Sequence, residues 1–352
     1  MQPILFVLPG FRPCSAVSQA LVAAHGFLAK GASVHVAGWG DANFLTNQLR
    51  AAGAEVHDLG RYRLFDAERL RCLYELTNSI RPTCTLVWGL PAVRLAGLLP
   101  RRLLGRLVAA KVLPISRAFL GRTSDAWLLR RTERIIVGGP SELDMALRLG
   151  LPAARVALIP PGVPNASDEK AAASPIPAGR YLLAVGPLER SKGLHDAIWS
   201  LEILKYLFDD LHLVIAGDGP DRQRLQDFVR AIDAEAAVHF LGVLPDLHAL
   251  YAGAAAVWIP SHADRGAQVA LEAMQAGRPI VASRRPRLAE LVVDGETCFL
   301  APPGDKVVWA KQTRKLLDDP SLGARLGQAG RRRVAELFSA DAYVARLSEL
   351  LQ

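Results

Sequence analysis

Residues 260–283 read PSHADRGAQVALEAMQAGRPIVAS, which places an acidic loop, a short helix and a strand in immediate succession. The run of strong helix formers after Gly266 predicts a helix over 267–276. Gly277 supplies the left-handed residue at which such a helix stops, and Pro279 cannot continue it. This stretch therefore has the pattern of one loop, helix and strand of an α/β domain.

Two carboxylates flank the start of this expected helix. Asp264 lies in the loop before it, and Glu272 projects from its second turn. The first turn of a helix offers unpaired N–H groups and about half a positive charge, which favour a phosphate group. We therefore expect Gly266, Ala267 and Gln268 to bind a diphosphate. A helix cap and a solvated glutamate are the alternative interpretation of the two acids.

Length and composition indicate a globular chain with two domains. The chain has 352 residues, 51% of them hydrophobic and 22% charged. Four cysteines are scattered without metal-ligand or redox spacing, which predicts free thiols in a reducing compartment. The first residues lack a basic signal region and no stretch approaches about 20 apolar residues, so we expect a cytoplasmic protein. The net charge of +8 favours an anionic partner: a phosphate ligand, a lipid surface or a nucleic acid.

Buried strands and amphipathic helices alternate along the whole chain. This alternation predicts parallel sheets built from right-handed crossover units. We expect a first Rossmann-like domain over 1–165, a linker rich in Ala, Ser and Pro over 166–179, and a second Rossmann-like domain over 180–335. The last helix, within 336–352, is expected to cross back to the first domain.

Six segments of the second half resemble, in order, motifs of family 4 glycosyltransferases of the GT-B fold. They are GPLERSKG (186–193), IAGDGP (215–220), FLG (240–242), the opening stretch with its Glu-Ala-Met, Gly and Pro, AELVVDG (289–295) and PGD (303–305). This resemblance implies two Rossmann-like parallel-sheet domains facing across a cleft. It also implies transfer of a sugar from a nucleotide-sugar donor, with the nucleotide on the second domain.

The resemblance also implies roles for individual residues. Glu272 is expected to hold the ribose hydroxyls, while Asp264 contacts the donor sugar and Lys192 the diphosphate, both as catalytic residues. The other residues that we expect near the donor are Arg190, Gly217, Gly219, Val243, Leu244 and Gly10. No Asp-x-Asp pair accompanies them, so neither a metal nor another cofactor is expected.

The implied reaction is hexosyl transfer with retention at the anomeric carbon, to a saccharide or lipid-linked acceptor. Three segments depart from the family pattern: 13–16 lack paired glycines, 83–88 lack a histidine, and Pro187 replaces an arginine. These departures leave two alternatives open. One is a catalytically silent GT-B protein that binds a nucleotide sugar or a partner, and the other is a nucleotide-sugar epimerase.

Residues 94–134 are strongly basic, with leucine and valine in the intervals. Such a composition is typical of a surface that lies on anionic lipid at the inner face of a membrane. A solvated positive face over core helices is the alternative. Nucleic acid is not expected, because no recognised reader motif is present.

Overall fold

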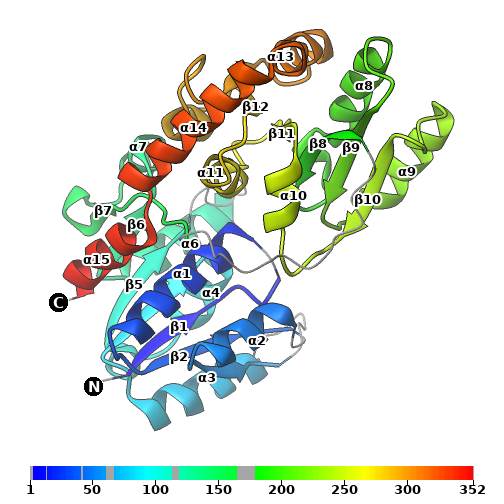
Figure 1. The fold of residues 1–352 in the computed structure, drawn as a ribbon. Helices are drawn as coiled ribbons and strands as arrows, with labels where there is room; N and C mark the ends of the chain where they lie inside the picture. Colours follow the sequence, from blue (N-terminus) through cyan, green and yellow to red (C-terminus); the bar gives the residue numbers. More distant parts are fainter. Residues whose placement is uncertain are drawn as a thin grey trace. The chain divides into compact units, whose positions relative to one another are not determined.

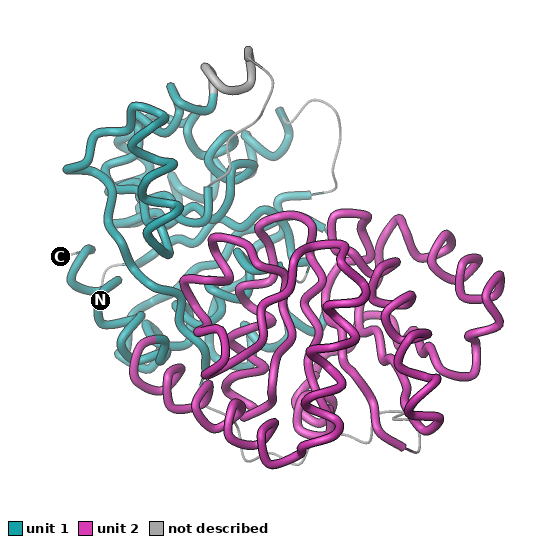
Figure 2. Tube along the Cα trace, turned by 90° about the horizontal axis from the view of Figure 1, so that it is seen from above, with its two compact units in different colours: residues 1–164, 338–352 teal, residues 165–337 magenta. Residues whose placement is uncertain are grey.

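The computed structural model of the chain describes residues 3–12, 14–40, 43–60, 67–112, 119–164 and 179–351. The chain divides into two compact units (Figure 2). Unit 1 consists of Met1–Pro164 and Phe338–Gln352, and unit 2 consists of Asn165–Leu337. The expected linker at 166–179 lies outside the described residues, apart from Gly179.

Unit 1 contains a parallel sheet of seven strands in the order β3-β2-β1-β4-β5-β6-β7 (Figure 1). Its strands are β1 (Ile4–Val7), β2 (Val34–Gly38), β3 (Glu55–Asp58), β4 (Cys84–Trp88), β5 (Arg106–Ala110), β6 (Arg134–Val137) and β7 (Val156–Leu158). The strand order reverses between β1 and β4, as in doubly wound sheets.

Helices cover both faces of this sheet, because successive residues of each buried strand face opposite sides. Phe6 packs into one apolar cluster with α1 (Ser15–Ala29), while Leu5 and Val7 pack into the other. The remaining helices are α2 (Phe44–Ala51), α3 (Ala67–Ile80), α4 (Leu90–Ala96), α5 (Arg101–Leu104), α6 (Phe119–Arg130) and α7 (Pro140–Arg148).

The last helix, α15 (Ala340–Leu351), belongs to unit 1. It packs against α1, where Val344 stands so close to Gly26 that a Cβ at Gly26 would overlap it. Ser339 forms a parallel bridge with Val163, and the Arg106 guanidinium donates to the carbonyls of Leu350 and Leu351. The C-terminal helix is thus part of the first core.

Unit 2 contains a parallel sheet of six strands in the order β10-β9-β8-β11-β12-β13. The strands are β8 (Arg180–Val185), β9 (Leu211–Ala216), β10 (Val238–Gly242), β11 (Ala256–Ile259), β12 (Ile280–Ser283) and β13 (Phe299–Ala301). The helices are α8 (Leu194–Lys205), α9 (Arg222–Ala231), α10 (His248–Gly253), α11 (Ala267–Gln275), α12 (Pro286–Leu291), α13 (Lys306–Asp318) and α14 (Pro320–Leu337). The expectation of two Rossmann-like parallel-sheet domains is confirmed.

Two helix starts differ from the usual sequence signals. Ser15 is the first helical residue of α1 rather than its cap, and the extended Cys14 precedes it without a side-chain cap. Although proline favours the first helical position, α9 begins at Arg222, two residues after Pro220. The backbone N–H of Asp221 donates to Leu188 O at 2.9 Å, and this bond holds the preceding turn against the loop after β8.

The basic stretch 94–134 is not one continuous amphipathic surface. Within it, β5 is a buried strand between β4 and β6, with Val108 and Ala109 fully inaccessible. The arginines on either side obscure this short apolar run in the sequence. Among the described helices, none combines the length and the apolar content needed to cross a membrane.

Candidate functional site

The candidate site lies in unit 2, at the carboxyl ends of β8 and β11. The strand order reverses between these two neighbours, and ligands of open α/β sheets bind outside the strand ends at such a reversal. The loops that leave β8 and β11 line a small pocket there, with contributions from Gly186, Lys192, Ser261 and Gly266.

Lys192 is the cation of this pocket. It follows Arg190 and Ser191 in a single 3-10 turn (Arg190–Lys192), and its Nζ lies 3.5 Å from the position that a Cβ on Gly186 would occupy. Burial lowers the pKa of the Lys192 ammonium; Arg265 lowers it further and Glu189 opposes the shift. Within the described part of the chain, no carboxylate forms an ion pair with Lys192. The side chain is therefore a half-buried positive charge suited to an anionic ligand.

The start of α11 is the second positive element. Gly266 is its N-cap with φ +117°, and a Cβ there would overlap the Ile259 side chain. Only glycine combines this backbone conformation with so close a packing contact. The first-turn N–H groups of Ala267 and Gln268 precede any intrahelical partner, as at every helix start. The structure thus brings the expected helix terminus and Lys192 to the same pocket.

Glu272 lies in the second turn of α11 and is half-buried. Its carboxylate accepts hydrogen bonds from Tyr251 Oη at 2.8 Å and from Gln268 Nε2 at 2.9 Å. Burial raises the pKa of Glu272, and these two hydrogen bonds oppose the shift. Because Tyr251 is buried, the Glu272 carboxylate is part of the packing between α10 and α11 as well as a candidate ribose ligand.

Asp264 lies in the exposed loop before α11, as expected. Its Oδ1 accepts a hydrogen bond from the backbone N–H of Arg287 at 2.9 Å, near the start of α12. The structure therefore shows a local role for Asp264, in which it ties the loop after β11 to the next helix. Contact with a donor sugar remains a prediction.

The Arg190 side chain is largely exposed. Its Nε lies 3.8 Å from Asp221, which is also held by Arg224 through paired hydrogen bonds of 2.7 and 2.8 Å. The structure thus gives Arg190 an anionic partner of its own. A role for Arg190 on the diphosphate stays a prediction.

Gly217 and Gly219 form the turn after β9. Gly217 has φ +145°, and a Cβ on it would overlap Gly186 O, while a Cβ on Gly219 would come within 2.5 Å of Leu188 O. Both glycines let this turn pack directly behind the loop that carries Lys192. Their role in the structure is to support the site through this close backbone approach.

Three other predicted site residues lie at different strand ends. Val243 and Leu244 follow β10, where the Val243 side chain is 51% exposed and Leu244 is half-buried. Gly10 belongs to unit 1, in the loop after β1, with φ +117° and the space for a Cβ limited by Trp39 O at 3.0 Å. The two units are described separately, so Gly10 is not placed relative to the pocket of unit 2.

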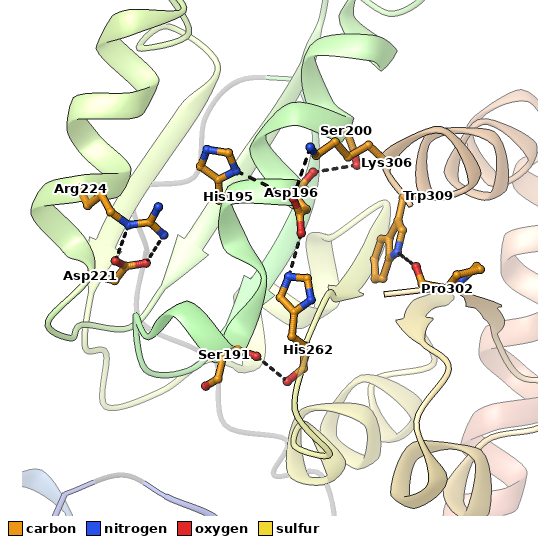
Figure 3. A network of polar contacts seen from close by, with 11 residues as sticks. Ser191, His195, Asp196, Ser200, Asp221, Arg224, His262, Pro302, Lys306 and Trp309 are labelled. Carbon is orange, nitrogen blue, oxygen red and sulfur yellow. Dashed lines mark hydrogen bonds and ion pairs between the residues drawn. The ribbon is translucent and has the colours of Figure 1, made fainter. Parts of the chain in front are cut away.

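A polar network lies beside the pocket and joins residues whose contacts the sequence did not predict (Figure 3). His262 Nε2 lies 2.8 Å from Asp196 Oδ2, and Lys306 Nζ lies 3.6 Å from the other oxygen of Asp196. The backbone N–H of His262 donates to Ser191 O at 2.9 Å, next to Lys192. No local pattern in the sequence marks Asp196 or Tyr251, because each meets its partner only across the fold. His262 could have been found from its position two residues before Asp264.

Residues 167–333, almost all of unit 2, match the family described as glycosyl transferases group 1. Over these residues, just under half of the chain, the sequence is similar to the group 1 glycosyltransferases. It is 36% identical over 217 residues to a glycogen synthase of Mycobacterium tuberculosis, a match that covers 61% of this chain and 52% of that protein. It is 28% identical over 332 residues to a D-inositol 3-phosphate glycosyltransferase of Salinispora arenicola, covering 87% of this chain and 72% of that one. The match to the first of these relatives spans about half of its length.

Solved structures show the fold of the whole chain. HepE from Anabaena, in complex with UDP-glucose, superposes with a TM-score of 0.86 and 18% identity, covering 100% of this chain and 99% of HepE. At this identity the likeness establishes the architecture alone. The chain has the GT-B fold, as its sequence motifs implied.

Proposed function

We propose that the chain transfers a hexosyl group from a nucleoside diphosphate sugar to an acceptor. The observation that carries this proposal is that Lys192 and the start of α11 line one pocket of unit 2. This pocket lies where the strand order reverses, between β8 and β11. Both elements are positive and both are partly shielded from water, which suits a diphosphate. The crystal structure of HepE with UDP-glucose supports a uridine nucleotide sugar as the first donor to test.

In the proposed reaction the bond between the anomeric carbon and the diphosphate breaks, and negative charge develops on the leaving phosphate oxygens. The Lys192 ammonium and the N–H groups of Ala267 and Gln268 would stabilise that charge without a divalent metal. The acceptor hydroxyl attacks from the face that the leaving group vacates and loses its proton to the departing phosphate. This route retains the anomeric configuration and requires no protein base.

Glu272 would bind the ribose hydroxyls through the carboxylate oxygens that Tyr251 and Gln268 orient. These two hydrogen bonds fix the carboxylate before the ligand arrives, which lowers the entropic cost of binding. Asp264 would contact the donor sugar from the exposed loop before α11. His262, fixed by Asp196, lies in the same loop.

The test is incubation of the chain with UDP-glucose labelled in the sugar. Release or transfer of labelled sugar, undiminished by a metal chelator, is the expected result, and the anomeric configuration of the product reports retention. Tight binding without release would support the silent binder, and conversion of the sugar while still attached to UDP would support an epimerase. Absence of both binding and turnover with every nucleotide sugar would overturn the donor site itself.

We also propose that unit 1 contacts anionic lipid through the exposed face around α4 and α6. Trp127 is 56% exposed, and the Arg131 guanidinium lies over its ring. Leu98, which follows shortly after the end of α4, is 58% exposed. Arg94 contributes less, since its guanidinium is paired with the buried Asp125 at 2.8 Å. Sedimentation with anionic vesicles should fall as salt screens these charges over about 10 Å. Equal sedimentation with neutral vesicles would count against the lipid surface.

A further inference from the structure

Three side chains of metal-ligating type meet on the outer strands of the unit 1 sheet. His35 comes from β2, and Glu55 and His57 come from the edge strand β3. Residues two apart on a strand share one face, and the register places His35 directly beside Glu55. The nitrogen and oxygen atoms that they offer all lie within 4.8 Å of one another. Within the described residues this is the one such group of three.

The separations fit a single small cation. His35 Nδ1 lies 3.1 Å from His57 Nε2 and 3.5 Å from Glu55 Oε2. Ligands at about 2.0–2.2 Å from a tetrahedral zinc ion stand roughly 3.3–3.5 Å from each other. Two of the three separations are therefore close to those around one ion, and the third, between His57 and Glu55, is within 4.8 Å.

The setting also suits a metal. The second ring nitrogen of His35 lies 3.4 Å from Ser33 Oγ, and ligating histidines usually have such a partner on the other nitrogen. The His35 side chain is buried, while 67% of the Glu55 side chain is exposed to solvent. Solvent thus has access for the ion and for a water as fourth ligand. His35 and Glu55 lie toward the amino ends of β2 and β3, away from the carboxyl end of β1 that precedes Gly10.

Unit 2 contains a natural counterpart that lacks the carboxylate. His212 of β9 and His239 of the edge strand β10 are also separated by 3.1 Å. The register pairs Val238 with Leu213, so Ala237 stands beside His212 where Glu55 stands beside His35. The two pairs of histidines therefore differ in the third ligand. This pair serves as an internal control for any effect of paired imidazoles alone.

We propose that His35, Glu55 and His57 form a zinc-binding site that links the edge strand β3 to β2. The chemistry of two imidazoles and one carboxylate suits zinc better than magnesium or calcium, which prefer oxygen ligands. The bound ion would stabilise the outer part of the unit 1 sheet. It takes no part in the donor site of unit 2.

The test is equilibrium dialysis of the untagged full chain against zinc chloride, followed by metal analysis. We expect one tightly bound zinc per chain. Glu55→Gln should weaken binding by about tenfold or more, and His57→Gln by about a hundredfold, since even outer partners of a ligand change affinity by 10–100-fold. The matched control His239→Gln should leave zinc affinity unchanged.

A second measurement covers the case of a variant that folds poorly. Saturating zinc at about a hundred times its Kd should raise the melting temperature of the wild type by about 5–10 °C. The same zinc should raise that of Glu55→Gln by only about half as much, and the exposed Glu55 side chain contributes little to folding. Loss of zinc in His239→Gln equal to that in His57→Gln would overturn the proposal, as would unchanged binding in Glu55→Gln. A wild-type chain that binds no zinc would overturn it as well.

Discussion

The loops that leave β1 and β8 occupy equivalent places in the two sheets, each at the reversal of strand order. Both are anchored by one buried apolar side chain, Phe11 in unit 1 and Leu188 in unit 2. Beyond that anchor they differ. In unit 2 an extra 3-10 turn returns Lys192 to the end of β8, whereas in unit 1 α1 begins at Ser15 and Arg12 is exposed.

One additional turn is thus what brings an ammonium to the end of β8. The buried Phe11 and Leu188 side chains hold both loops against their sheets, but among the described residues of the unit 1 loop no lysine takes the place of Lys192. The proposed donor site therefore rests on this turn of unit 2. The following experiments either break this contrast or sharpen it.

The largest expected effect is on folding, from Gly217→Ala. The substituted Cβ would overlap Gly186 O at a backbone φ of +145°, so unit 2 should lose about 3 kcal/mol of stability. In unit 1, Gly10→Ala also has a strained φ, but its Cβ would stand 3.0 Å from Trp39 O rather than overlap it. This variant should lose about 1–2 kcal/mol of stability. Urea unfolding of both variants measures the difference. Equal losses would mean that the turn behind the Lys192 loop is not tightly packed.

Lys192→Ala should reduce turnover per bound donor by about ten- to a hundredfold, since a charge-assisted contact contributes about 1.5–3 kcal/mol. Lys192→Arg should restore part of the rate because it keeps the charge. Arg12→Ala, in the equivalent loop of unit 1, is the matched control and should change donor binding little. Release of labelled sugar under single-turnover conditions provides the rates. An equal loss in Arg12→Ala would remove the contrast between the loops.

Glu272→Ala should weaken nucleoside binding by about tenfold, in line with one lost charge-assisted hydrogen bond. It should also lower the melting temperature, because the buried Tyr251 hydroxyl loses its acceptor. The double variant with Tyr251→Phe should recover stability but not affinity. Calorimetry and thermal melting separate the two effects. Lost stability with full nucleoside affinity would restrict Glu272 to a structural role.

The smallest expected effect is a pH dependence. Burial lowers the pKa of Lys192, so the ammonium loses its proton at a lower pH in the folded chain than in the unfolded chain. The burial of this charge costs stability below the folded pKa, and that cost diminishes as the pH rises from the folded to the unfolded pKa. Diphosphate affinity should move the opposite way, falling a few-fold between about pH 7 and about pH 10. The diphosphate affinity of Lys192→Arg should show no such fall. If Lys192→Arg and the wild type had the same pH profile, Lys192 would be excluded as the source of the fall.

Local patterns predicted most of the fold and one half of the site. The start of α11 was predictable because Gly266 and Gly277 act within their own turns. By contrast, β5 was hidden, since its apolar run is short and arginines surround it. The contacts of Glu272 with Tyr251 and of His262 with Asp196 join residues 21 and 66 positions apart. No sequence period encodes such pairings, because they arise only when α10 packs against α11 and the loop after β11 meets α8.

The most direct test of the donor site is a calorimetric titration of UDP and uridine into the wild type and Lys192→Ala. We expect the wild type to bind UDP much more tightly than uridine. Lys192→Ala should lose about ten- to a hundredfold of UDP affinity while its uridine affinity stays the same. Equal losses for UDP and uridine would show that Lys192 does not contact phosphate, and would contradict the assignment of the diphosphate to the loop after β8.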